Sequence, residues 1–175
     1  MNLLNEVFIG KLFSDPEQFF VQLLVVVFSI CCHEYSHAWM ALRQGDPTAA
    51  ERGHLTLNPL KQMGTFSLIM LAFLGIAWGM TPVNPKRFKH RYSDALVSFA
   101  GPGMNLLLFV VFCLLTAIAV MSKMQPTAVH IFFTGALFNM VLFILNMLPI
   151  PPLDGWSVLN CFFPQLRGKP RNPAL

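Results

Sequence analysis

The segment from Cys31 to Trp39 carries two histidines four residues apart, with a glutamate directly after the first. If this segment is helical, His33 and His37 lie on one face, about 6 Å apart along the helix axis. Two imidazoles placed in this way can bind one divalent metal ion, and Glu34 can then serve as a base for a water at the metal. The same five-residue pattern also arises by chance on polar helices. Here it interrupts an apolar run, where ionisable residues are costly and usually functional.

A third ligand is needed, because a catalytic zinc site usually has three protein ligands and leaves a fourth position for water. Asp154 is the best candidate, since it is the only carboxylate that follows Asp94. The Pro-x-x-Asp-Gly context also suits a turn or the start of a short helix over 156–163, and both roles can hold at once. Cys32 adjoins the histidines and is an alternative. The four cysteines have no paired spacing, however, and are better explained as small buried apolar residues.

Three further polar residues are candidates for contact with a substrate. Asn146 could donate a hydrogen bond to the oxyanion that forms at a scissile carbonyl, or hold the substrate backbone; hydrogen bonding between helices is the equal alternative. Asn105 requires a polar partner inside the helix bundle and is a second candidate. His54 could be another ligand or a substrate contact, although a lone histidine on a short strand is more often an interfacial polar residue.

The composition is that of a membrane protein. Of the 175 residues, 55% are hydrophobic and 11% are charged, whereas soluble domains have about 25% charged residues. The formal charge of +4 does not indicate nucleic-acid binding, because the basic residues lie in short loops between apolar runs. The length suits one domain, 1–175. The N-terminus lacks the positive region of a signal peptide, so we expect the first apolar segment to remain in the mature protein.

Three apolar segments are long enough to cross a bilayer. The predicted spans are about 19–42, 95–122 and 127–148, and capping residues around Asp15 predict the start of the first helix. Residues 53–58 alternate polar and apolar and predict a short strand and turn. The sequence therefore predicts an all-α polytopic membrane protein, with a three-helix core and a membrane-associated β or re-entrant loop or hairpin over 53–82.

The apolar stretch 63–80 decides the topology. If it spans the membrane, the two histidines and Asp154 lie near opposite faces. If it dips in and returns, Asp154 reaches the level of the histidines, and only Lys11 and Lys123 among twelve basic residues lie on the other side. We favour the second arrangement, in which the positive-inside rule places the ten-charge side and the site towards the cytoplasm. Irregular backbone at that depth must be covered by protein or line a water-filled cavity.

Several motifs in order give the chain a resemblance to the site-2 protease family of intramembrane zinc metalloproteases, in a minimal form. The matching segments are His33–His37, Gly53–Pro59, Ala100–Asn105 and Asn146–Gly155. The resemblance implies zinc bound by His33, His37 and Asp154, with Glu34 as the catalytic base. It also implies that Asn146 lies near the substrate.

The function expected from these features is intramembrane endopeptidase activity on transmembrane protein substrates, with one zinc ion per chain, in the plasma membrane. No PDZ or CBS domain is evident, and the chain stops soon after the Asp-Gly pair, where relatives commonly continue into another helix. The alternative is a metal-binding membrane protein without protease activity, such as a carrier or an inactive adaptor. Glu34 argues against that alternative, because metal binding needs no base at this position.

Overall fold

A computed structural model describes residues 8–163, and its first long helix begins where the capping residues predict. A 3-10 turn, η2 (Phe8–Gly10), and a short helix, α1 (Lys11–Ser14), lead into α2 (Pro16–Arg43). The Asp15 carboxylate accepts a hydrogen bond from the Gln18 N–H at 3.0 Å. Proline at the first helical position and a capping carboxylate are both typical of helix starts.

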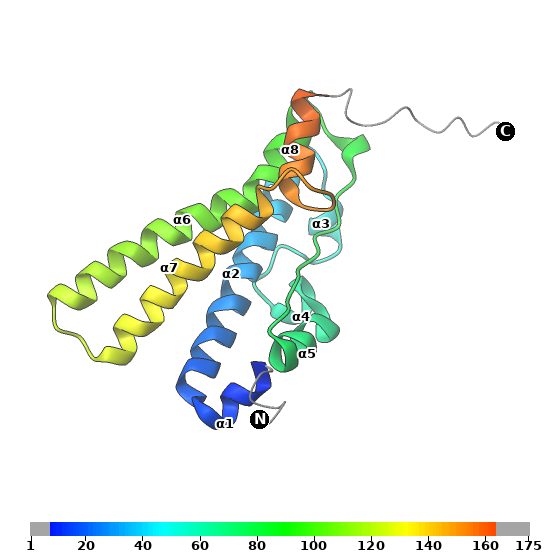
Figure 1. Cartoon of the computed structure of the whole chain (residues 1–175). Helices are drawn as coiled ribbons and strands as arrows, with labels where there is room; N and C mark the ends of the chain where they lie inside the picture. Colours follow the sequence, from blue (N-terminus) through cyan, green and yellow to red (C-terminus); the bar gives the residue numbers. More distant parts are fainter. Residues whose placement is uncertain (1–7, 164–175) are drawn as a thin grey trace.

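Three helices are long and apolar enough to cross a membrane: α2, α6 (Ser93–Met121) and α7 (Pro126–Asn146). Helices α6 and α7 form an antiparallel hairpin, which packs against α2 near the end that carries α8 and diverges from it towards the opposite end (Figure 1). The described part of the chain is therefore all-helical with three candidate membrane spans. This agrees with the predicted polytopic helical core and indicates a multi-pass membrane protein.

The two hairpin helices present apolar side chains outward. Leu107, Leu114, Ile118 and Phe133 are each more than half exposed. In water an apolar surface of this extent would require a partner, whereas lipid covers it without cost. By contrast, half of the most apolar window of α2 is buried. Helix α2 is thus the central element, and its buried side is where polar residues can be held.

The connection from α2 to α6 contains short helices and, within residues 8–163, no strand. The helices are α3 (Thr48–Glu51), α4 (Pro59–Gln62), α5 (Gly64–Leu74) and the 3-10 turn η3 (Pro85–Arg87). The predicted strand at 53–58 is therefore wrong. The Gln62 side-chain amide donates to the carbonyls of His54 at 2.8 Å and Thr56 at 2.6 Å. One side chain thus satisfies backbone groups that a partner strand would otherwise have to pair.

Helix α5 is followed by a reversal and an extended return. Its 11 residues span about 16 Å, which is too short for a hydrocarbon core of about 30 Å. The chain turns at Gly75, where φ is 74°. Residue Ser67 then binds the backbone of Trp78 twice, accepting from its N–H at 3.0 Å and donating to its carbonyl at 2.7 Å. The segment 53–82 is a helix-and-return hairpin, and its entry into the membrane stays a prediction.

The apolar core lies where the helix-and-return hairpin over 53–82 packs on α2. Its buried members come from α2 and from the start and middle of the hairpin: Val26, Ile30, Cys31, Met63 and Leu71. Phe138 and Leu142 of α7 pack against the same cluster. The last described helix, α8 (Asp154–Phe162), packs mainly against α6. It follows a loop in which the bond between Pro151 and Pro152 is cis.

A buried carboxylate ties the C-terminal end of α2 to the far end of the extended segment. Asp46 is fully buried, and its Oδ2 accepts from the Asn84 N–H at 2.6 Å. Its Oδ1 accepts from the N–H and the hydroxyl of Thr48. Burial raises the pKa of the Asp46 carboxyl, but these hydrogen bonds outweigh burial and hold the pKa below its usual value.

We expect Asp46→Asn to lower the free energy of unfolding at pH 7 by about 1–3 kcal/mol, because an amide nitrogen would face backbone donors. The folded pKa is depressed, so the ionised carboxyl stabilises the protein above the unfolded pKa of about 3.9, and that stability is lost as pH falls through the folded pKa. The difference between wild type and variant should therefore shrink below about pH 4. Thermal unfolding in detergent from pH 7 to pH 3 measures this. Glu51→Gln is the matched control, since the carboxylate of Glu51 is 60% exposed and its Arg87 pair is long at 3.4 Å.

Candidate metal centre

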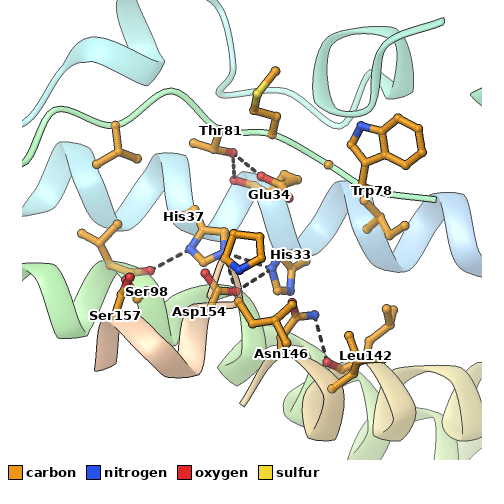
Figure 2. A pocket seen from close by; sticks show the side chains of 18 of the residues that line it. His33, Glu34, His37, Trp78, Thr81, Ser98, Leu142, Asn146, Asp154 and Ser157 are labelled. Carbon is orange, nitrogen blue, oxygen red and sulfur yellow. Dashed lines mark hydrogen bonds and ion pairs between the residues drawn. The ribbon is translucent and has the colours of Figure 1, made fainter. Parts of the chain in front are cut away.

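Two imidazoles and one carboxylate converge where α2 meets α8 (Figure 2). The Nε2 atoms of His33 and His37 lie 2.9 Å apart. The Asp154 Oδ2 lies 3.2 Å from the first of these nitrogens and 3.3 Å from the second. Both histidines are buried, and the carboxylate is 22% exposed. The two histidines predicted from the sequence and the distant aspartate thus bring three possible ligand atoms close together.

The start of α8 places Asp154 with little freedom. Asp154 is the first residue of the helix, and Leu153 before it is the capping position, so the carboxylate is free to face the histidines. Gly155 packs directly on the backbone of Met147, and a side chain there would collide with it. Burial raises the pKa of the Asp154 carboxyl, but hydrogen bonds and charge from the two histidines outweigh it and lower the pKa to about 2. The carboxylate is therefore ionised at neutral pH.

Each histidine is oriented through its other ring nitrogen. The Nδ1 of His37 lies 2.7 Å from the carbonyl oxygen of Val97 in α6. A carbonyl only accepts, so this Nδ1 carries a proton, and Nε2 is the nitrogen that can bind a metal ion. The Nδ1 of His33 lies 2.6 Å from the Oδ1 of Asn105. Partners of this kind are typical of metal-binding histidines.

The three ligand atoms suit a zinc ion. Tetrahedral coordination at bond lengths near 2.05 Å requires ligand atoms about 3.3 Å apart, which is close to the separations of 2.9, 3.2 and 3.3 Å found here. Gly101 of α6 faces the same point, and a Cβ there would collide with the Nε2 atoms of both histidines. The space beside the ligands is thus kept open by a missing side chain. Two imidazoles and one carboxylate are also a ligand set found in catalytic zinc sites.

The glutamate of the motif is held by the extended segment. Glu34 is buried, and its Oε2 lies 2.6 Å from the hydroxyl of Thr81, which also lies 3.0 Å from the Glu34 carbonyl. Gly79 passes so close to Glu34 that a side chain there would overlap the carboxyl group. The segment after α5 therefore orients this carboxylate and leaves room beside it.

A cavity of about 500 Å³ contains the ligands and the glutamate. Its lining includes polar residues such as Ser98, Asn146 and Ser157. It also includes apolar residues such as Ile30, Trp78 and Leu145. A largely apolar lining with a few polar groups is typical of ligand-binding and enzyme sites.

The other predicted site residues lie in three different environments. Asn146 lines the cavity, although its side-chain amide donates to the Leu142 carbonyl of its own helix at 2.9 Å (Figure 2). Asn105 is fully buried against His33 and is not among the residues that line the cavity. His54 lies in the turn after α3, also outside the cavity lining, with a buried Nδ1 that has no hydrogen-bond partner.

Two residues of the site carried no recognisable signal in the sequence, and a third carried only a weak one. Thr81 lies in a Thr-Pro pair that reads as a loop, and Gly101 reads as a helix-packing residue. Asn139 is an isolated polar residue in an apolar run, and that isolation alone could have marked it as a buried hydrogen-bonding residue. Their roles depend on which helix each residue faces.

A helical membrane protein with two histidines, an aspartate and a neighbouring glutamate in one cavity has the features of a membrane-bound metallopeptidase. The chain belongs to peptidase family M50, whose family model matches residues 21–123 and 115–174. The resemblance recognised in the sequence is thereby confirmed.

Similar proteins carry related names. YwhC of Bacillus subtilis strain 168, named as a zinc metalloprotease, is 38% identical over 150 residues, which cover 81% of this chain and 68% of that protein. Rip2 of Mycolicibacterium smegmatis is 36% identical over 75% of this chain, and Rip2 of Mycobacterium tuberculosis H37Rv is 34% identical over 79%. The matches cover 53% and 54% of the Rip2 proteins, so the chain spans about half their length. No solved structure matches.

Gly101→Ala tests the open space beside the ligands. We expect zinc affinity to fall at least tenfold, because the added methyl group would occupy the position between the two Nε2 atoms. Alanine is a better helix former than glycine by about 1 kcal/mol, so α6 itself should not be weakened. Metal content after equilibration with a competing chelator measures the effect.

Gly103→Ala is the control, because its Cβ would meet the flexible ring of Phe99 at 3.2 Å, away from the ligands. Equal zinc affinity in the two variants would contradict the placement of the metal.

Proposed function

We propose that the chain is an intramembrane zinc endopeptidase that hydrolyses peptide bonds in or near transmembrane segments of membrane proteins. The observation that carries the proposal is the convergence of His33, His37 and Asp154 in one cavity with Glu34. Membership of peptidase family M50 and the names of the relatives support a zinc-dependent peptidase. Three apolar spans support a membrane-embedded substrate.

The proposed roles follow from the chemistry of each group. His33, His37 and Asp154 would hold one zinc ion, which when bound would lower the pKa of a water molecule towards 7 and polarise the scissile carbonyl. Glu34 would accept a proton from that water at its carboxylate and deliver it to the leaving amine. Thr81 donates to one oxygen of Glu34, which leaves the other oxygen for the proton.

We expect the substrate to enter the cavity as an extended stretch rather than as a helix. A helical substrate hides its peptide bonds in its own hydrogen bonds, so it must unwind before its carbonyl can reach the ligands. Asn146 lines the cavity and carries a side-chain oxygen and nitrogen that can bind a substrate backbone. The apolar part of the lining, with Trp78 and Leu145, suits the apolar side chains of a membrane segment.

We further propose that residues 1–175 act as one domain in the plasma membrane, with the cavity towards the cytoplasm. Ten of the twelve Lys and Arg residues would then lie on the side of the metal centre. The positive-inside rule favours the cytoplasm for that side. The hairpin over 53–82 would enter the membrane from the same side, covered by α2 and by its own side-chain hydrogen bonds.

Glu34→Gln is the most direct test of the proposed reaction. The variant keeps the shape of the side chain and the three ligands, but an amide cannot accept the proton. We expect cleavage of a purified transmembrane peptide to fall by at least 100-fold, with zinc content unchanged. Wild-type protein treated with a chelator should also lose cleavage, and added zinc should restore it.

Cleavage that survives in Glu34→Gln would rule out the proposed proton transfer. Wild-type protein that binds zinc but cleaves none of several membrane peptides would instead indicate a carrier or an adaptor. Absence of zinc from the wild-type protein would rule out the site itself.

Thr81→Val tests how the base is held. The substitution preserves the branched shape but removes the hydroxyl that donates to Glu34. We expect kcat to fall about tenfold, a typical loss for a misplaced catalytic group, while KM and zinc content change little. Thr81→Ser retains the hydroxyl and should restore most of kcat. If both variants have the activity of the wild type, the Thr81 contact does not position the base.

A further inference from the structure

A chain of buried polar side chains leads from the metal centre into the interior of the helix bundle. Asn105 of α6, Asn139 of α7 and Ser29 of α2 are each fully buried. The Asn105 side-chain amide donates to the Asn139 Oδ1 at 3.0 Å, and Asn139 in turn donates to the Ser29 Oγ at 2.8 Å. In a segment suited to lipid, no water is at hand to replace these partners. Each group therefore depends on the next.

In this series of hydrogen bonds, the contact farthest from the metal centre determines the orientation of each side-chain amide. The Asn139 Nδ2 lies 2.8 Å from the carbonyl oxygen of Gly135, one turn earlier in its own helix. A carbonyl cannot donate, so the nitrogen of Asn139 must face it and the oxygen must face Asn105. Asn105 then has to present its nitrogen to Asn139. Its oxygen is left to face His33.

The orientation of the Asn105 amide determines where His33 carries its proton. The oxygen of Asn105 lies 2.6 Å from the His33 Nδ1 and can only accept a hydrogen bond. Nδ1 of His33 therefore carries a proton, which leaves Nε2, the nitrogen nearest Asp154, as the atom that can bind a metal ion. Reversing the Asn105 amide would bring its NH₂ group against the Nδ1 proton and its oxygen against the oxygen of Asn139. Burial makes such a mismatch costly, at about 1–3 kcal/mol for each unpaired group.

We propose that Asn105 and Asn139 are positioning residues that hold His33 in the tautomer required for metal binding. His37 obtains the same tautomer directly from the Val97 carbonyl. His33 has an amide partner, which could face either way, and the Gly135 carbonyl removes that ambiguity through Asn139. This proposal rests on the metal site of the proposed function. It gives Asn105 a role in ligand orientation in place of the substrate contact expected from the sequence.

The first test needs no substitution and no metal. Metal-free wild-type protein, labelled with ¹⁵N at histidine, is examined by NMR in detergent micelles. We expect the His33 signal, assigned by its loss in His33→Gln, to show a protonated Nδ1. An unprotonated Nδ1 on His33 would overturn the proposal. The outcome does not depend on zinc binding, so it is independent of the proposed function.

The second test measures zinc affinity by chelator competition in three variants. Asn105→Leu removes the acceptor for His33 and should weaken zinc binding by about 10–100-fold. Asn139→Leu leaves Asn105 free to reverse, and a smaller loss of a few-fold is expected. Asn105→Asp keeps an acceptor for His33 but loses the donor to Asn139, so zinc affinity should stay within about threefold of wild type even if the protein is less stable.

Thr116→Val is the control, because it removes a hydroxyl bond to the Phe112 carbonyl in the same helix, away from the ligands. Thermal unfolding is recorded for every variant. If zinc affinity falls in step with stability in Asn105→Leu, Asn105→Asp and the control alike, the asparagines stabilise the fold without positioning the ligand. Recovery of affinity in Asn105→Asp alone supports the proposal. A wild-type protein without zinc affinity would refute the metal site, and the NMR result would still decide the tautomer.

Discussion

The contact of one carboxylate with two imidazoles is the constraint on which the rest of the structure depends. Asp154 lies more than a hundred residues from His33 and His37 in sequence, yet its oxygen is within 3.3 Å of both ring nitrogens. Burying these groups among apolar helices is costly unless each has a partner. The close approach of Gly155 to the end of α7 and the open face at Gly101 make the contact sterically feasible.

The helix-and-return hairpin solves a second problem, which is how to pair irregular backbone beside the candidate metal centre. Ser67 and Gln62 satisfy backbone groups of the hairpin with their side chains, so no neighbouring strand is required. The extended return then brings Thr81 to Glu34, and Gly79 passes beside the carboxylate. The same segment thus passes beside the candidate metal centre and orients the Glu34 carboxylate.

The helix bundle has apolar residues on its outer surface and polar amides in its interior. The outer faces of α6 and α7 carry exposed apolar residues such as Leu114 and Phe133, which lipid can solvate. The inner faces carry fully buried amides, Asn105 and Asn139, which hydrogen-bond to each other. A cavity of about 500 Å³ lies at the end of the bundle where α2, α6 and α8 meet. Asn105 and Asn139 are not among the residues that line this cavity, so the interior amides stay covered by the helices.

The sequence by itself determined what depends on local spacing. Helical periodicity places His33, Glu34 and His37 together, capping residues start α2 at Pro16, and long apolar runs produce three candidate spans. Only the tertiary structure showed that Asn105 contacts His33 and that Thr81 contacts Glu34, and it replaced the expected strand at 53–58 by a turn held by a side chain. The two contacts join residues that are 47 positions apart (Thr81 and Glu34) and 72 positions apart (His33 and Asn105) in the sequence. The turn at 53–58 reflects the absence of a partner strand in the described chain. Packing between helices sets such contacts, and no periodicity within one segment encodes them.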